Sequence, residues 1–225
     1  MVTADRAAQE LRQAREQDRE SARAYFRAAL DYVTPEPPRL VAVAGLSGTG
    51  KSTLAAALAP KVGGAPGAVH LRSDLERKAL AGIGELQRLP ASAYTKEASK
   101  RVYEILEHKV SLVLATGHSV VVDAVYARAE ERRGIAAIAA ALGVPFRGFW
   151  LKADPELLIS RVAARRNDAS DATPEVVQAQ LRFEAEALSP AWTMIEAGGA
   201  ADDTLRSVSS ALGLVTAKPQ PDELV

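Results

Sequence analysis

Cysteine is absent from this chain of 225 residues, and histidine occurs only three times. The lack of cysteine excludes disulfides and thiolate metal sites, and three scattered histidines do not favour a zinc site. No apolar run approaches the ~18 residues of a membrane span. The N-terminus also lacks the basic and then apolar pattern of a signal peptide. We therefore expect a cytoplasmic protein without a membrane partner.

A surplus of charge of either sign is also missing, since Lys+Arg and Asp+Glu both number 28. Aromatic residues make up only 5% of the chain, which leaves little material for a base-stacking track. Both features argue against a broad nucleic-acid or membrane-surface binder. Hydrophobic residues at 48% and charged residues at 25% are ordinary for a globular protein, and the length suits one α/β domain with an appendage.

The chain does contain a glycine-rich stretch, GLSGTGKST, between an apolar run at 40–44 and a helical pattern at 53–59. The spacing G-x-x-x-x-G-K-S is that of the phosphate-binding loop, or P-loop. Its alternative, an ordinary glycine turn, does not account for the Lys-Ser pair. We expect Lys51 to reach the β- and γ-phosphates of ATP and the Ser52 hydroxyl to hold Mg²⁺. The predicted nucleotide-binding residues are Gly45, Ser47, Gly48, Thr49, Gly50, Lys51, Ser52 and Thr53.

Composition divides the chain into four parts. We predict a helical extension at 1–34, a Pro-rich linker at 35–38, the main domain at 39–213 and a flexible tail at 214–225. The extension is very polar, which favours a solvated helix over a partner-binding one. In the main domain apolar strands alternate with helical patterns, which predicts a parallel sheet with ligands at the carboxyl ends of its strands. The predicted strands are 40–44, 68–71, 120–123, 145–151 and 192–195.

Two carboxylates follow predicted strands. Asp74 comes just after the second strand, where it could accept the proton of an attacking hydroxyl, or simply cap a helix. Arg77, one helical turn later, could pair with Asp74 or bind substrate, whereas Lys78 is expected on a solvated face. Asp123 ends a run of three valines, where an unpaired carboxylate would be costly. We interpret it as a ligand of Mg²⁺ or of substrate, with a salt bridge or helix cap as the alternative.

Arginines end another predicted helix, which runs from 154 to 165. Arg161 and Arg165 are four residues apart and are expected to share a face. Beside a transferred phosphate they would neutralise developing charge, and the loop at 166–173 would close as a lid. The alternative is favourable interaction with the helix dipole on a solvated face. Three tyrosines are equally compatible with a substrate pocket and with the core: Tyr94, Tyr103 and Tyr126.

These motifs occur in one order: the P-loop, D-x-x-R at 74–77, V-V-V-D at 120–123 and R-x-x-x-R at 161–165. The order resembles the P-loop kinases grouped around gluconate kinase, zeta toxin, chloramphenicol phosphotransferase and the polynucleotide 5′-hydroxyl kinases. The likeness spans about residues 39–213. The stretches LRSDLERK, GHSVVVDAVYARAEER and RRNDASDAT most resemble the kinase-like ATP-binding domain often fused behind an aminoglycoside-phosphotransferase-like domain.

The resemblance implies a P-loop NTPase three-layer fold, with a five-stranded parallel sheet in the order 2-3-1-4-5 and helices on both faces. It implies that Asp74 activates the acceptor hydroxyl, that Arg165 is the lid arginine, and that the segment near 195–200 borders the adenine. The expected activity is an ATP- and Mg²⁺-dependent kinase for a hydroxyl of a sugar-like or antibiotic-like small molecule. A polynucleotide 5′-hydroxyl kinase and a non-catalytic ATP-binding regulatory module are the alternatives, and the oligomeric state stays open.

Overall fold

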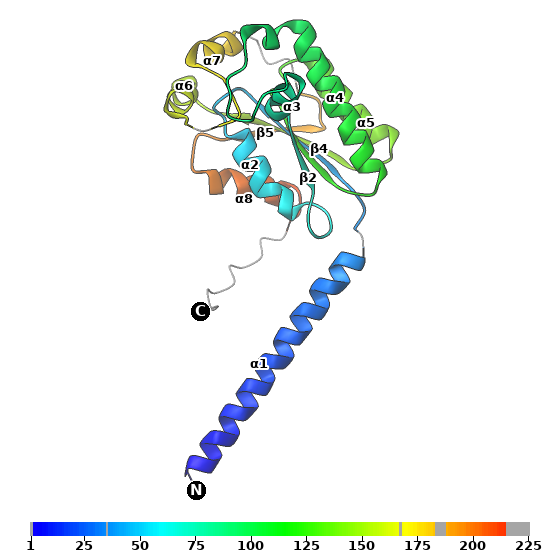
Figure 1. Cartoon of the computed structure of the whole chain (residues 1–225), viewed down its shortest axis with the longest axis vertical. Coiled ribbons are helices and arrows are strands. Elements are labelled where there is room, and N and C mark those ends of the chain that lie inside the picture. The colour runs from blue at the N-terminus through cyan, green and yellow to red at the C-terminus, as the bar shows by residue number, and fades with distance from the viewer. Residues whose placement is uncertain (1, 35, 167, 183–187, 215–225) are drawn as a thin grey trace.

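A five-stranded parallel sheet forms the centre of the computed structural model (Figure 1), which describes residues 2–34, 36–166, 168–182 and 188–214. The strand order is β2-β3-β1-β4-β5, which confirms the predicted order. Each predicted strand is present within one residue of its expected bounds. The strands are β1 (Leu40–Gly45), β2 (Val69–Arg72), β3 (Val120–Asp123), β4 (Phe146–Lys152) and β5 (Trp192–Glu196).

The central strand β1 is buried along its whole length and pairs with β3 on one side and β4 on the other. Its side chains alternate between the two faces, as strand geometry requires. Leu40 and Ala42 pack in a core with the helices α4 (Lys96–Ala115) and α5 (Ala129–Ala141). Val41 and Val43 pack in a second core with α2 (Lys51–Leu58) and α8 (Ala201–Ala211). The sheet therefore lies between two helical layers, as expected for the three-layer fold (Figure 1).

Helices α4 (Lys96–Ala115) and α6 (Pro155–Ala164) begin at residues whose side chains cap them. Thr95 accepts a hydrogen bond from the Ala98 amide at the start of α4, and Asp154 caps α6 with Pro155 in its first turn. The helices are α2 (Lys51–Leu58), α3 (Ser73–Leu80), α4 (Lys96–Ala115), α5 (Ala129–Ala141), α6 (Pro155–Ala164), α7 (Pro174–Leu181) and α8 (Ala201–Ala211), with 3₁₀ turns at Ala59–Lys61 and Ala91–Tyr94.

The N-terminal extension is one long helix, α1 (Val2–Val33), which projects away from the domain (Figure 1). Its side chains from residue 8 onward are exposed, as expected for a solvated helix. Within the described residues, no helix is both long and apolar enough to cross a membrane. Residue 35 of the predicted linker and all of the predicted tail beyond residue 214 lie outside the described residues.

Candidate active site

The P-loop connects the end of β1 to the start of α2. Gly48 and Gly50 both have positive φ angles, near +88° and +87°, which glycine adopts without strain. A Cβ atom at Gly48 would lie 2.6 Å from the carbonyl oxygen of Leu158 in α6, so this turn has no room for a side chain. Lys51 lies over the loop, and its Nζ donates to the Leu46 carbonyl at 3.0 Å. The first turn of α2 thus presents backbone amides and an ammonium group together.

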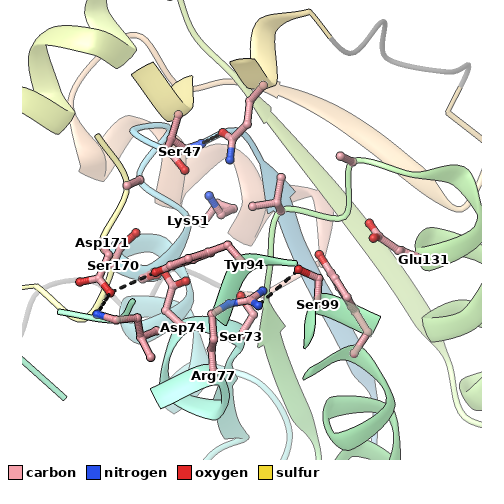
Figure 2. Close-up of a pocket in the computed structure, with 18 of the residues that line it drawn as sticks. Ser47, Lys51, Ser73, Asp74, Arg77, Tyr94, Ser99, Glu131, Ser170 and Asp171 are labelled. Atoms are coloured by element: carbon pink, nitrogen blue, oxygen red, sulfur yellow. Dashed lines mark hydrogen bonds between the residues drawn. The ribbon is translucent and has the colours of Figure 1, made fainter. Parts of the chain in front are cut away.

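A cavity of about 1130 Å³ opens beside this loop, at the carboxyl ends of the strands (Figure 2). Most of the predicted site residues line it, although they come from elements far apart in the sequence. Four predicted residues do not belong to its lining: Gly45, Thr49, Asp123 and Arg161. The predicted residues that do line it are Ser47, Gly48, Gly50, Lys51, Ser52, Thr53, Asp74, Arg77 and Arg165.

Asp123 lies directly beneath the P-loop and is only 3% exposed. Its Oδ1 accepts a hydrogen bond from the Ser52 hydroxyl at 2.9 Å, and its Oδ2 lies 2.6 Å from Nε2 of His70. No sequence motif marks His70 as a site residue. Its strand β2 pairs with β3 so that His70 lies opposite Val121, on the same face of the sheet as Asp123. The Arg72 guanidinium also lies 3.9 Å from Oδ2, so the costly buried carboxylate has three partners among the described residues.

The chemistry of Ser52 and Asp123 fits Mg²⁺, which prefers oxygen ligands. Within the described residues, no group of three or more His, Cys, Asp or Glu side chains could hold a metal ion. Magnesium in kinase-type sites commonly uses one or two protein oxygens and completes its shell with phosphate oxygens and water. The pair is thus suited to a metal that arrives with a nucleotide.

Asp74 lies in the first turn of α3 and lines the same cavity as Lys51 (Figure 2). Burial raises the pKa of the Asp74 carboxyl above its usual value, while the nearby Lys51 ammonium and a hydrogen bond with the Ser170 side chain act in the opposite direction. Burial likewise lowers the pKa of Lys51, and the charges of Asp123 and Asp74 oppose that effect. A carboxylate with a raised pKa in a cavity is suited to accept a proton.

Arg77 is held on the α4 side of the cavity. It donates to the Ala93 carbonyl at 2.8 Å and to the Ser99 hydroxyl at 3.3 Å, and its guanidinium lies 5.0 Å from the centre of the Tyr94 ring. Among the ion pairs of the described residues, none joins Arg77 to Asp74. Arg77 therefore lines the cavity without an ion pair to Asp74 among the described residues.

The structure places four residues whose surroundings were predicted or left open in the sequence analysis. Lys78 was expected on a solvated face, but this prediction is wrong because its side chain is only 2% exposed and lies among partners described below. Tyr126 belongs to the core, at 1% exposed, and its ring packs 5.4 Å from that of Tyr103. Tyr94 and Tyr103 both line the cavity.

The two candidate lid arginines bind different groups. Helix α6 ends at Ala164, and Arg165 is its C-cap residue. Arg161 donates to the carbonyls of the segment 197–199, at 2.9 Å for Ala197. Arg165 lines the cavity, with its Nε 3.6 Å from Asp168. Residue 167 of the predicted lid lies outside the described residues.

Gln180 on α7 also reaches the site, and sequence reasoning missed it. Its Oε1 accepts a hydrogen bond from the Ser47 amide of the P-loop at 2.8 Å, across 133 positions of the chain. No local pattern marks this residue, because the contact depends on the packing of α7 beside α6. The P-loop is therefore contacted by both helices that follow β4.

Comparison with known families gives a match that covers most of this site. The model of an AAA domain family (AAA_33) matches residues 40–186, more than half of the chain. The chain belongs to this AAA domain family. Uncharacterized proteins of Mycobacterium tuberculosis and Mycobacterium bovis are 32% identical to the AAA domain chain over 145 residues. That match covers 63% of this chain and 28% of theirs, so the chain spans a minor part of these relatives.

Solved structures share the fold of this AAA domain. A sugar kinase from Janibacter sp. HTCC2649 is 19% identical with a TM-score of 0.58, covering 80% of this chain and 96% of its own. A gluconokinase from Sinorhizobium meliloti 1021 is 19% identical with a TM-score of 0.57, covering 79% and 93%. The APS kinase CysC of Mycobacterium tuberculosis, in complex with AMPPNP and APS, is 20% identical with a TM-score of 0.56, covering 80% and 99%. These neighbours bear out the P-loop NTPase fold.

Proposed function

We propose that this AAA domain protein is an ATP- and Mg²⁺-dependent kinase that transfers the γ-phosphoryl group to a hydroxyl of a sugar-like or antibiotic-like small molecule. One observation carries the proposal: Lys51 of the P-loop and the Asp74 carboxyl line one cavity from two different strand ends. A triphosphate bound at the P-loop would direct its terminal phosphate toward the Asp74 carboxyl. The kinase names of the structural neighbours support the same reaction class.

On the nucleotide side, the amides of the P-loop and the first turn of α2 bind the phosphates, because a helix N-terminus offers unpaired N–H groups and a positive dipole end. Lys51 leaves the Leu46 carbonyl and takes phosphate oxygens instead. Ser52 and Asp123 hold Mg²⁺, which when bound neutralises charge on the phosphates. Arg161 fixes the segment 197–199 against α6, where the family resemblance places the adenine.

On the acceptor side, Asp74 orients the hydroxyl and takes its proton as the oxygen attacks the γ-phosphorus. The bond from the γ-phosphorus to the bridging oxygen breaks, and ADP leaves with that electron pair. Arg165 at the cavity stabilises charge on the transferred group. Its present partner Asp168 lies on the exposed side of the cavity, and the resulting ion pair is weak enough to exchange for phosphate.

The test is a screen of sugars, aminoglycosides, nucleosides and oligonucleotides with γ-labelled ATP and Mg²⁺, with Asp74→Asn as the matched control. We expect label on a small-molecule hydroxyl with the wild-type protein and almost none with the variant. Label on an oligonucleotide 5′-hydroxyl would instead favour a polynucleotide kinase. Tight ATP binding without label on any acceptor would favour a non-catalytic regulatory module.

A further inference from the structure

We propose that Asp171 is a positioning residue that fixes the acceptor-facing wall of the cavity, and this inference rests on the proposed function. The wall is the segment 85–94, between α3 and α4, which contributes four residues to the cavity lining: Arg88, Leu89, Ala91 and Tyr94. It has no regular structure except for the short 3₁₀ turn at its end. Its position therefore depends on side chains from other segments.

Asp171 binds this wall at two points. Its Oδ2 accepts hydrogen bonds from the Leu89 amide at 2.9 Å and from the Tyr94 hydroxyl at 3.0 Å. Its Oδ1 lies 3.3 Å from Nζ of Lys78. Both oxygens of one carboxylate, only 10% exposed as a side chain, are thus engaged with groups from two other segments of the chain, α3 and the wall.

Lys78 completes the arrangement from beneath. Its side chain is 2% exposed, and its Nζ donates to the carbonyl oxygens of Glu85 at 2.5 Å and Gln87 at 2.7 Å. A buried ammonium needs such partners, because burying an unpaired charge is very costly. The one carboxylate in its set of hydrogen-bond partners is Asp171, so Lys78 and Asp171 together hold both ends of the wall.

The position of Tyr94 follows from this arrangement (Figure 2). Its hydroxyl is held by Asp171 at one end, and the Arg77 guanidinium lies over its ring. Arg77 in turn donates to the Ala93 carbonyl. The residue before Asp171, Ser170, lines the same cavity as the Asp74 carboxyl. The segment that holds the wall therefore also borders the proposed base.

The test combines hydrogen–deuterium exchange of the full chain with ADP titration calorimetry and steady-state kinetics. In Asp171→Asn we expect peptides covering 85–94 to exchange about tenfold faster, as when a hydrogen bond to a charged group is lost. The dissociation constant for ADP stays unchanged. With the acceptor identified by the labelled-ATP screen, the KM for that acceptor rises by about tenfold while the KM for ATP does not.

Two further variants make the result specific. Lys109→Gln breaks the ion pair of Lys109 with Glu76, which joins α4 to α3 without touching the wall, and should leave exchange at 85–94 unchanged. Tyr94→Phe removes only the hydroxyl and should speed exchange near residue 94 even if Asp171→Asn does not fold. The proposal would be overturned if hydrogen–deuterium exchange at 85–94 were unchanged in both Asp171→Asn and Tyr94→Phe. It would also be overturned if exchange became faster evenly over the whole chain and ADP binding became weaker. Failure of the wild-type protein to bind ADP or transfer label would refute the proposed function, not this exchange result.

Discussion

Replacing Asp74 by Asn removes the proposed base while preserving the shape of the side chain. A positioned general base contributes roughly 10²–10⁴ to a rate, which corresponds to about 3–5 kcal/mol of barrier. The full loss is expected because neighbouring carboxylates are already engaged: Asp168 with Arg72 and the Ser170 amide, and Asp171 with Lys78. Neither could readily take over the proton. The kcat of Asp74→Asn should therefore fall by roughly 10²–10⁴ while its ADP affinity is retained.

The same variant should be more stable than the wild-type protein. Because burial raises the pKa of Asp74 above the usual 3.8, the folded state binds its proton more tightly than the unfolded chain does. The free energy of unfolding therefore falls as the pH rises from the unfolded pKa through the raised one, and the cost remains at pH 7. Asparagine carries no charge and avoids this cost. The Tm of Asp74→Asn should exceed that of wild type at pH 7, and the difference should shrink as the pH is lowered toward 4.

Both effects can be measured on one preparation, by label transfer from ATP and by thermal unfolding between pH 4 and pH 8. The pH profile of wild-type kcat/KM adds a check, because its acidic limb should lie above the pH expected for an ordinary aspartate. Wild-type-like turnover by Asp74→Asn would refute the assignment of the base. A lower Tm for the variant at pH 7 would refute the account of the buried carboxylate.

Three other predictions concern the nucleotide side. Lys51→Ala should weaken ATP binding, measured by calorimetry, because the loop loses its ammonium group. Arg165→Ala should lower kcat by roughly 10²–10³ with little effect on ATP affinity. Arg161→Ala frees the segment 197–199 and should mainly weaken nucleotide binding. The same change in kcat and in ATP affinity for both variants would contradict the different roles given to the two arginines. Gly48→Ala should lower stability by about 1–3 kcal/mol in denaturant unfolding, because its Cβ meets backbone of α6, and should cost more than Gly50→Ala, whose Cβ meets nothing within 4 Å.

Local patterns were sufficient to predict a parallel sheet covered by helices and much of the cavity, whereas the strand order came from the family resemblance. The apolar run at 40–44 predicted a central strand, and the glycine spacing after it predicted the P-loop. Asp74 and Asp123 were found because polar groups at the carboxyl ends of parallel strands meet at one edge of the sheet. These inferences depend on residues close together in sequence, or on the general geometry of α/β sheets.

Contacts between distant segments could not be predicted in this way. Lys78 looked like a surface residue because its buried partners, the carbonyls at 85 and 87 and Asp171, become visible only in the folded chain. Arg161 was paired with Arg165 from their spacing alone, whereas its partners, the carbonyls at 197–199, lie far along the chain. His70 and Gln180 carry no motif, and their roles depend on strand register and on helix packing.

The central claim is that the P-loop and Asp74 form one site for phosphoryl transfer. A crystal structure of the chain with Mg²⁺ and AMPPNP tests it most directly. The account predicts phosphates on the amides of the P-loop, Lys51 turned from the Leu46 carbonyl to the terminal phosphate, and the Asp74 carboxylate facing that phosphate across the acceptor space. An empty P-loop at saturating nucleotide, or a terminal phosphate directed away from Asp74, would contradict it.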